Sequence, residues 1–266
     1  MMKEKILNAL TTECPWRDTL YWYDTIDSTN TRLKELARYG AVAGTVVLAG
    51  QQSAGRGRLG RSFHSPAGLG LYISVLLRPE CRPEALMHLT CAAAVAVCDG
   101  IEEITGLRPG VKWINDLVLN RRKLGGILTE LSVDSKTGLV DYAIVGIGIN
   151  CRHDSHDFPQ ELQDIATSLH TEKLDADPAS LAAAVITALQ RMNSNLFCQK
   201  DRIMAQYRAD CITLGQDVTI CRFEDRKPGK ALDVDEEGAL VVQLPDGSVQ
   251  HVNSGEVSVR GLYSYI

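Results

Sequence analysis

Hydrophobic and polar residues alternate in short stretches over about the first 150 residues, and stretches of helical spacing lie between them. Alternation with many β-branched residues predicts strands. The predicted strands are Leu20–Asp24, Thr45–Ala49, Leu71–Leu77, Val111–Trp113, Leu117–Leu119, Ile127–Leu131 and Val140–Ile149. Apolar residues three and four apart predict helices over roughly 29–39, 84–104 and 179–208, and the last can break near Asn193–Asn195. Strands and helices mix without a regular βαβ repeat, so we expect an α+β fold, a mixed or antiparallel sheet with helices over one face.

The pattern changes after about Ile212, where short alternating runs follow one another: DVTICR, KALDVD, ALVVQL, SVQHV and EVSVR. Turn pairs such as Glu237-Gly238 separate them, which predicts a small β-barrel or sandwich of about fifty residues. We therefore expect two domains, residues 1–211 and 212–266. Residues 151–178 are polar and acidic, and we expect a long surface loop with room for one helical turn.

Composition and charge narrow the class of protein. The 266 residues are 45% hydrophobic and 23% charged, which is typical of a globular protein with a full core. The 28 lysines and arginines against 33 acidic residues give a net charge of −5. This balance argues against broad binding to nucleic acid or to an anionic membrane, so a basic site must be local.

The eight cysteines form no CxxC pair, which fits a reducing cytoplasm rather than a disulfide framework or a zinc site. Cys91 and Cys98 are seven residues apart in an alanine-rich stretch, so we expect both to face a core. The N-terminus lacks the apolar run of a signal peptide, and the longest apolar run, near 91–98, is too short to span a bilayer. We expect a cytoplasmic protein.

The region with the most distinctive chemistry is Gln51–Gly70, QQSAGRGRLGRSFHSPAGLG, here called the basic segment. It contains three arginines, five glycines and no acidic residue. Glycines let backbone N–H groups approach an anion and arginines bind phosphate oxygens, so the segment predicts a phosphate or nucleotide cradle; a solvated basic loop is the alternative. Gly55, Gly57 and Gly60 satisfy GxGxxG, and the stretch nearly satisfies a Walker A pattern. Both motifs need a helix directly afterwards, and the following FHSPAGLG predicts none.

A second cluster lies in VKWINDLVLNRRKLGGILTE, residues 111–130. Lys123 begins a return strand beside a glycine pair, so its ammonium can point at a bound anion. Arg121 and Arg122 are expected to be solvated turn residues, and Asp116 could equally cap a turn. Two more motifs, Asp27–Asn30 and Gly146–Asn150, are individually typical of a helix cap and of a tight exit from a sheet.

The loop of residues 151–178 also holds residue types that bind metals, His153, Asp154, His156 and Asp157. No predicted strand or helix would hold these side chains rigid. A solvated loop is therefore the favoured interpretation, and no residue is assigned as a metal ligand.

Taken in order, DSTN, QQSAGRGRLGR, VKWIND, RRKLGGIL and GIGIN resemble the catalytic domain of biotin–protein ligases, from about residue 20 onward. The resemblance implies a class II synthetase-like biotin ligase fold with a C-terminal SH3-like β-barrel. It implies an ATP-dependent biotin–[biotin carboxyl carrier protein] ligase that forms biotinyl-5′-adenylate and then biotinylates a carrier lysine. ATP, biotin and Mg²⁺ are the implied cofactors. The implied partner is a biotin carboxyl carrier protein or domain of a carboxylase, with no nucleic acid or membrane, and the protein is expected to be a monomer or weak homodimer.

The resemblance also implies roles for individual residues. Those matching the biotin-ring ligands are Ser28, Thr29, Asn30 and Gln52. Arg56, Gly57 and Arg58 match a loop that closes over biotin and adenylate, and Gly126 matches a glycine that lets the ring approach the backbone. Nucleotide, magnesium or acceptor-lysine contacts are implied for Lys112, Asn115, Asp116 and Asn150. The implied catalytic residues are Lys123, at the biotin carboxylate and α-phosphate, Arg58, at the phosphate, and Asp116, which orients or deprotonates the incoming lysine.

The sequence departs from the family at Ser53, Leu59, Phe63 and Ile114, none of which removes a required charge. Only about twenty residues precede the first predicted strand, too few for the helix-turn-helix domain of the repressor class, so operator binding is not expected. The nearest alternative is a lipoate or octanoate ligase or transferase of the same superfamily. Such a transferase needs a poised cysteine, and lipoate ligases carry a His-Asp pair, whereas Ser65 follows His64 here. A nucleic-acid-binding module that uses the arginines is an alternative from another class.

Overall fold

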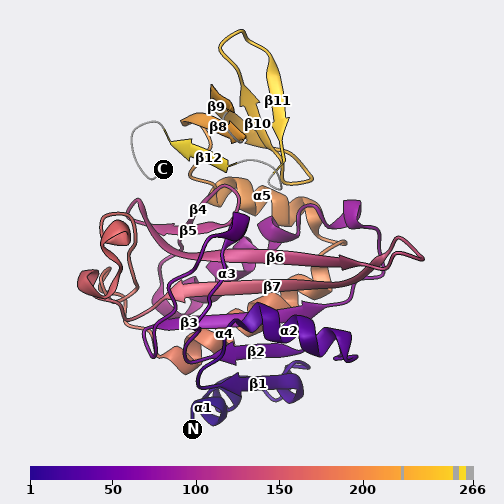
Figure 1. The fold of residues 1–266 in the computed structure, drawn as a ribbon, viewed down its shortest axis with the longest axis vertical. Coiled ribbons are helices and arrows are strands. Elements are labelled where there is room, and N and C mark those ends of the chain that lie inside the picture. The colour runs from indigo at the N-terminus through magenta and orange to yellow at the C-terminus, as the bar shows by residue number, and fades with distance from the viewer. Residues whose placement is uncertain (223–224, 254–257, 262–266) are drawn as a thin grey trace.

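The computed structural model describes residues 1–222, 225–253 and 258–261. Its larger part is a seven-stranded sheet with helices on both faces (Figure 1). The strands are β1 (Leu20–Tyr23), β2 (Val46–Ala49), β3 (Gly70–Leu77), β4 (Gly110–Lys112), β5 (Asp116–Leu119), β6 (Arg122–Val133) and β7 (Val140–Asn150). They are arranged in the order β1-β2-β3-β7-β6-β5-β4, and only the β1–β2 pair is parallel. Every predicted strand is present, and the mixed sheet is confirmed.

The helices are α1 (Met2–Ala9), α2 (Thr29–Arg38), α3 (Leu89–Thr105), α4 (Pro178–Asn195) and α5 (Lys200–Asp210). Single turns of 3₁₀ helix are η1 (Arg17–Thr19), η2 (Arg58–Gly60), η3 (Pro83–Leu86), η4 (Ser155–Asp157) and η5 (Gln160–Leu162). The predicted helices are confirmed, including the break after Asn195, whereas α1 was not predicted. Local chemistry sets several ends. Asp177 caps α4 by accepting a bond from the Ser180 N–H at 2.9 Å, and Gly106 ends α3 in the left-handed conformation.

Alternate residues of the strands pack against different layers. Val46 and Leu48 belong to the main core, which the residues of α3 and α4 complete, whereas Val47 belongs to a second cluster with Leu33 and Ala37 of α2. The predicted layer of helices over one face is therefore present, and α2 adds a short helix on the opposite face (Figure 1). This single helix covers that face only in part, which leaves room for a site.

Helix α3 is the central helix of the main core. With η3 it forms a helical stretch, Pro83–Thr105, that is long and apolar enough to cross a membrane. This stretch is longer than the apolar run near 91–98 that the sequence analysis considered. However, 72% of its most apolar 18-residue segment is buried inside the protein, where the helix packs against α4. Gly100 allows this close packing, because an added Cβ would lie 2.8 Å from Val185 Cα. Cys91 and Cys98 both face this core, as predicted.

The C-terminal part is a five-stranded antiparallel sheet in the order β11-β10-β9-β8-β12. Its strands are β8 (Asp217–Arg222), β9 (Asp225–Val234), β10 (Leu240–Gln243), β11 (Val249–Val252) and β12 (Ser258–Gly261). They match the predicted runs, although Glu256 and Val257 of EVSVR lie outside the described residues. The Trp113 Nε1–H, from the segment after β4, donates to the Gly238 carbonyl at 3.0 Å. Buried side chains of both sheets form one continuous core, so the boundary at 211/212 stays a prediction.

Candidate active site

The glycines of β7 create space on the sheet face that α2 covers only in part. In GIGIN, Gly146 and Gly148 alternate with isoleucines, and successive residues of a strand point to opposite faces. Ile147 and Ile149 belong to the main core, so the glycines face the other way. Because the glycines have no side chain, the Asn30 amide and the Phe63 ring can lie directly on the strand, and these groups line a cavity of about 520 Å³.

The cavity is lined by every residue to which the family resemblance assigns a role. These residues come from the start of α2, the basic segment, β4 to β6 and the end of β7: Ser28, Thr29, Asn30, Gln52, Arg56, Gly57, Arg58, Lys112, Asn115, Asp116, Lys123, Gly126 and Asn150. Motifs that are far apart in the sequence therefore meet at one site. The role of each residue stays a prediction.

One end of the cavity holds hydroxyl and amide groups that are bonded to one another. The Thr29 N–H and hydroxyl donate to Gln52 Oε1 at 2.9 and 3.1 Å, and Gln52 Nε2 donates to Ser65 Oγ at 3.0 Å. Asn30 is buried, and its amide lies over Gly146, where an added Cβ would overlap it. Hydroxyls and amides at fixed positions suit a neutral polar ligand better than an ionic one.

The other end of the cavity carries charge. Lys123 Nζ lies 2.6 Å from Asp116 Oδ1, and Asn115 Nδ2 donates to the same oxygen at 3.2 Å. Arg58 Nη1 donates to Asn115 Oδ1 at 2.8 Å. Burial lowers the pKa of Arg58, and the nearby Asp116 carboxylate opposes this shift. Two cations and one carboxylate are thus connected around Asn115, as an anionic ligand with a transferable proton would require.

An irregularity in β6 determines where Lys123 points. Gly126 pairs with Asp116 and Gly125 with Leu117, but Lys123 rather than Leu124 pairs with Val118. This bulge places two residues of β6 opposite one of β5. Leu124 turns into the core with no exposed surface, and Lys123 shares the cavity face with Asp116 and Gly126. In a regular ladder, Lys123 would point to the opposite face.

The basic segment forms a roof over the cavity. The Gly57 N–H donates to the Arg61 carbonyl at 2.7 Å, and the Phe63 N–H donates to the Gly55 carbonyl at 2.9 Å. The Phe63 ring lies against Gly148, where an added Cβ would overlap it. After η2, residues 61–69 form no helix and lead into β3. The rejection of the GxGxxG and Walker A readings is therefore confirmed.

The segment 151–178 is a wall of the cavity, which corrects the prediction of a surface loop. Four of its residues line the cavity: Phe158, Leu162, Ile165 and Ala166. Its backbone pairs with β6, because the Lys123 N–H donates to the Ile165 carbonyl at 2.7 Å and the Thr167 N–H donates to the Lys123 carbonyl at 2.8 Å. Arg122, expected to be solvated, is ion-paired with Glu172 at 2.8 Å. Buried apolar residues at irregular spacing gave no periodic signal in the sequence.

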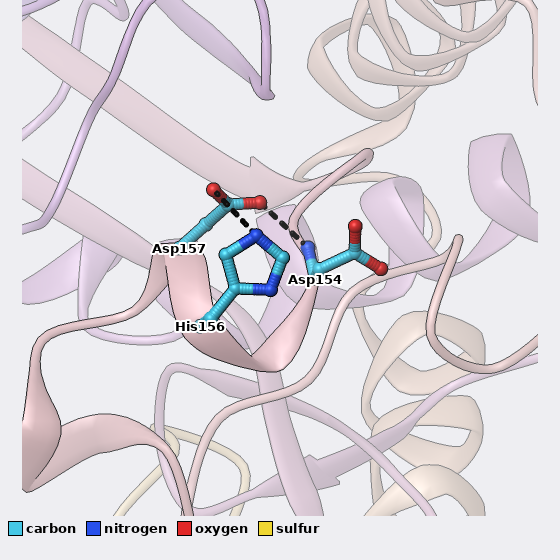
Figure 2. Close-up of side chains that lie close together, drawn as sticks. All are labelled: Asp154, His156 and Asp157. Carbon is cyan, nitrogen blue, oxygen red and sulfur yellow. Dashed lines mark hydrogen bonds and ion pairs between the residues drawn. The ribbon is translucent and has the colours of Figure 1, made fainter.

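Asp154, His156 and Asp157 gather at η4, with ligand atoms within 4.8 Å of one another (Figure 2). The Asp154 N–H donates to Asp157 Oδ2 at 2.8 Å, so this carboxylate caps the turn. The His156 side chain is 80% exposed, in agreement with the predicted solvated loop. His153 contradicts that prediction, because it is fully buried and stacks on Phe158 with 4.6 Å between ring centroids.

Other contributors to the site were missed by the sequence analysis. Gly146 and Gly148 were interpreted as a tight exit from the sheet, although strict alternation of glycine and isoleucine indicates an empty face over a strand. Glu130 and Ser74 lie next to the cavity and bond to Asn30. Glu130 is the only acidic residue of β6, and it follows the apolar run Ile127–Leu128, which was the available signal for it.

Comparisons with known proteins agree with this geometry. The chain matches the model of the Biotin/lipoate A/B protein ligase family over residues 22–150 and that of the Biotin protein ligase C terminal domain over residues 213–260. It is 34% identical over 263 residues to the bifunctional ligase/repressor BirA of Bacillus subtilis, which covers 97% of this chain and 79% of that protein. It is 30% identical over 237 residues to the biotin–[acetyl-CoA-carboxylase] ligase of Mycobacterium tuberculosis, which covers 86% of this chain and 85% of that protein.

Solved structures show the same fold. The biotin protein ligase from Aquifex aeolicus in complex with biotin and ATP superposes with a TM-score of 0.77 and 31% identity, over 91% of this chain and 99% of that one. The identity over nearly the whole chain, the two family models and the shared fold lead to one conclusion: the chain belongs to the biotin protein ligase family.

Proposed function

We propose that this protein is an ATP-dependent biotin–[biotin carboxyl carrier protein] ligase. A carboxylate oxygen of biotin attacks the α-phosphorus of ATP, and pyrophosphate leaves as biotinyl-5′-adenylate forms. The amine of a carrier lysine then attacks the acyl carbon, loses a proton, and AMP leaves. The observation that carries this proposal is a single cavity whose neutral end holds Thr29 and Gln52 and whose charged end holds Arg58 and Lys123.

The two ends match the two parts of the reaction. A ring urea is neutral and exchanges hydrogen bonds with hydroxyls and amides, as the Thr29–Gln52 end offers. Negative charge develops on the phosphoryl oxygens during adenylate formation, and Lys123 and Arg58 provide fixed positive charge there. In this proposal Asp116 orients and deprotonates the lysine amine; the 2.6 Å contact of its carboxylate with the Lys123 ammonium supports this role, because it shows that the carboxylate can bind an ammonium group.

Magnesium accompanies ATP in this proposal. Among the described residues that line the cavity, Asp116 carries the only carboxylate, and Asn115 and Asn150 add amide groups. Mg²⁺ keeps several waters and is usually held by one or two carboxylates together with substrate phosphates. These oxygen and amide groups therefore fit a metal that arrives with the nucleotide. The Mg²⁺ ion would neutralise charge on the phosphates.

The lipoate or octanoate alternative is less well supported. An acyl transferase of that kind needs a reactive thiol, and no cysteine lines the described cavity. Cys151 directly follows β7, but burial raises the pKa of its thiol to about 12, so it is not a nucleophile at neutral pH. His64 lies at the roof with Nε2 3.1 Å from the Asp157 carbonyl oxygen, rather than in a His-Asp pair within the basic segment.

The proposal extends to the partner and to the organisation of the chain. The second substrate is a lysine of a biotin carboxyl carrier protein or domain, and the ligase acts as a monomer or weak homodimer. Residues 1–211 carry the reaction, and residues 212–266 form the C-terminal β domain.

The test is labelling of a purified carrier domain in the presence of biotin, ATP and Mg²⁺. Mass spectrometry should show one added biotinyl group on one lysine, and the product should not form when ATP is omitted. Lipoate and octanoate serve as competing substrates. Transfer of either of these in preference to biotin, or no transfer at all, would contradict the proposal.

A further inference from the structure

Glu130 is a partly buried carboxylate on β6 that the proposed reaction does not use. Its side chain is 18% exposed and has three partners. Oε1 lies 2.6 Å from Lys34 Nζ of α2 and 3.3 Å from Arg56 Nη2 of the basic segment, and Oε2 accepts a bond from Asn30 Nδ2 at 2.9 Å. Burial alone would raise the pKa of Glu130, but the bonds from Lys34 and Asn30 and the two nearby positive charges lower it below its ordinary value. Glu130 is therefore ionised at neutral pH.

An ionised carboxylate determines how the Asn30 amide is oriented. A carboxylate only accepts hydrogen bonds, so the amide nitrogen of Asn30, and not its oxygen, must face Glu130. The second amide hydrogen points to the Leu128 carbonyl at 3.4 Å. Asn30 Oδ1 is thereby turned toward Ser74, whose hydroxyl lies 2.5 Å away. Both polar atoms of the Asn30 side chain thus have partners within the protein.

The orientation of Asn30 affects its hydrogen-bond partner Ser74. Ser74 is fully buried, and its hydroxyl has one hydrogen but two acceptors in reach, Asn30 Oδ1 at 2.5 Å and Thr29 Oγ1 at 2.8 Å. An amide oxygen facing Ser74 attracts that hydrogen, whereas a flipped amide would itself donate and send the Ser74 hydrogen to Thr29. The Thr29 hydroxyl donates to Gln52 Oε1, so the charge of Glu130 sets whether the Thr29 oxygen also accepts the Ser74 hydrogen or keeps its lone pairs free toward the cavity.

We propose that Glu130 is a positioning residue that sets the hydrogen-bond direction of the biotin-binding end of the cavity, through Asn30 and Ser74 to Thr29. This inference rests on the proposed function, because it assigns the ring urea to that end. Glu130 makes no contact with the ligand in this scheme. Its effect reaches biotin through three buried residues, Asn30, Ser74 and Thr29.

A double-mutant cycle tests the relay, with biotin dissociation constants measured by calorimetry. Glu130→Gln keeps the shape but lets the amide of Asn30 flip, and Ser74→Ala removes the next group. Each single variant should weaken biotin binding about tenfold, the value of one hydrogen bond to a charged group. Glu130 and Ser74 both bond to Asn30 and act along the same path. The double variant should therefore bind biotin about as strongly as the single variant with the lower affinity, and the two losses should not multiply.

Controls separate positioning from packing. Glu130→Asp keeps the charge and should retain more biotin affinity than Glu130→Gln. Glu35→Gln affects only an exposed pair with Arg32 on the same helix as Asn30 and should change biotin affinity less than twofold. ATP affinity should be unchanged in every variant, and circular dichroism at the assay temperature checks folding.

The possible outcomes are distinct. Losses that multiply in the double variant, equal losses in Glu130→Gln and Glu130→Asp, or a Glu130→Gln protein that binds biotin like the wild type would overturn the positioning role. A folded wild-type protein that binds no biotin would instead overturn the proposed function, and the inference with it.

Discussion

Replacing Lys123 by methionine removes an ammonium group from the charged end of the cavity while keeping the length of the side chain. The Lys123 Nζ lies 2.6 Å from Asp116 Oδ1, and the side chain is 28% exposed, so the charge is shielded from water over most of its surface. Arg58 remains as a second cation nearby, bonded to Asn115. The variant therefore lacks one positive group at the place where phosphoryl charge develops, whereas Arg58 and Lys112 still line the cavity.

The expected loss follows from this geometry. Removal of one preorganised donor from a developing anionic centre typically lowers the rate by ~10²–10³, or about 2.7–4 kcal/mol of transition-state stabilisation. Arg58 prevents a larger loss, and partial exposure argues against a much stronger contribution from a single charge. We expect adenylate formation by Lys123→Met to be slower by about this factor, at saturating biotin and ATP.

The assay is pyrophosphate release in the first turnover, measured with excess enzyme over biotin. Lys136→Met is the matched control, because Lys136 is exposed in the turn between β6 and β7 and does not line the cavity. It should release pyrophosphate at the wild-type rate. Transfer from preformed biotinyl-5′-adenylate should suffer less than adenylate formation in Lys123→Met. Wild-type pyrophosphate release by a folded Lys123→Met protein would refute the role assigned to Lys123.

Three further predictions concern other parts of the site. Arg58→Lys should behave as a loss, slowing adenylate formation about tenfold or more, because a point charge cannot reproduce the guanidinium that reaches Asn115; unchanged single-turnover kinetics would contradict this. Gly148→Ala should weaken biotin binding measured by calorimetry, because the new Cβ overlaps the Phe63 ring, and wild-type affinity would show that the roof adapts freely. Burial, with the neighbouring His64, lowers the pKa of His153 to about 4. As the pH falls, His153 therefore binds a proton in the unfolded chain at a higher pH than in the folded protein. The unfolding free energy consequently falls as the pH drops from about 6.5 toward 4. Between pH 7 and pH 5 the wild type should therefore lose about 2 kcal/mol more unfolding free energy than His153→Phe. Denaturation curves that show the same loss in both proteins would disprove this prediction.

The fold could be predicted from the sequence wherever side chains alternate between a buried and a less buried side. Strand β2 is an example. Val46 and Leu48 pack in the main core and Val47 packs under α2, so every residue of this strand segment is buried and apolar. The N-terminal helix α1 escaped prediction because it has two turns and buries only Ile6. A helix this short depends on its contacts with α4 and β1 rather than on its own periodicity.

The candidate site could be predicted as a set of residues but not as an arrangement. Motif order brought Thr29, Arg58 and Lys123 together, and the structure places all three around one cavity. The sequence did not contain the information that Glu130 faces Asn30, since the two are 100 residues apart and meet only through the pairing of β6 with β7 beneath α2. Long-range register of this kind follows from the assembled sheet, and local patterns do not specify it.

The position of Lys123 shows most clearly why local reasoning was incomplete. Its correct face depends on the bulge at Leu124 in the pairing of β6 with β5. On the other side β6 approaches β7 so closely that an added Cβ at Gly125 would overlap the Gly148 carbonyl oxygen. The same lysine also needs the backbone of Ile165 and Thr167 to hold β6 in place on its outer side. That support comes from a segment whose polar composition had indicated a solvated loop. The glycine pair and the 151–178 wall thus act together on one ammonium group, so a change in either should alter the reaction without removing any charged residue.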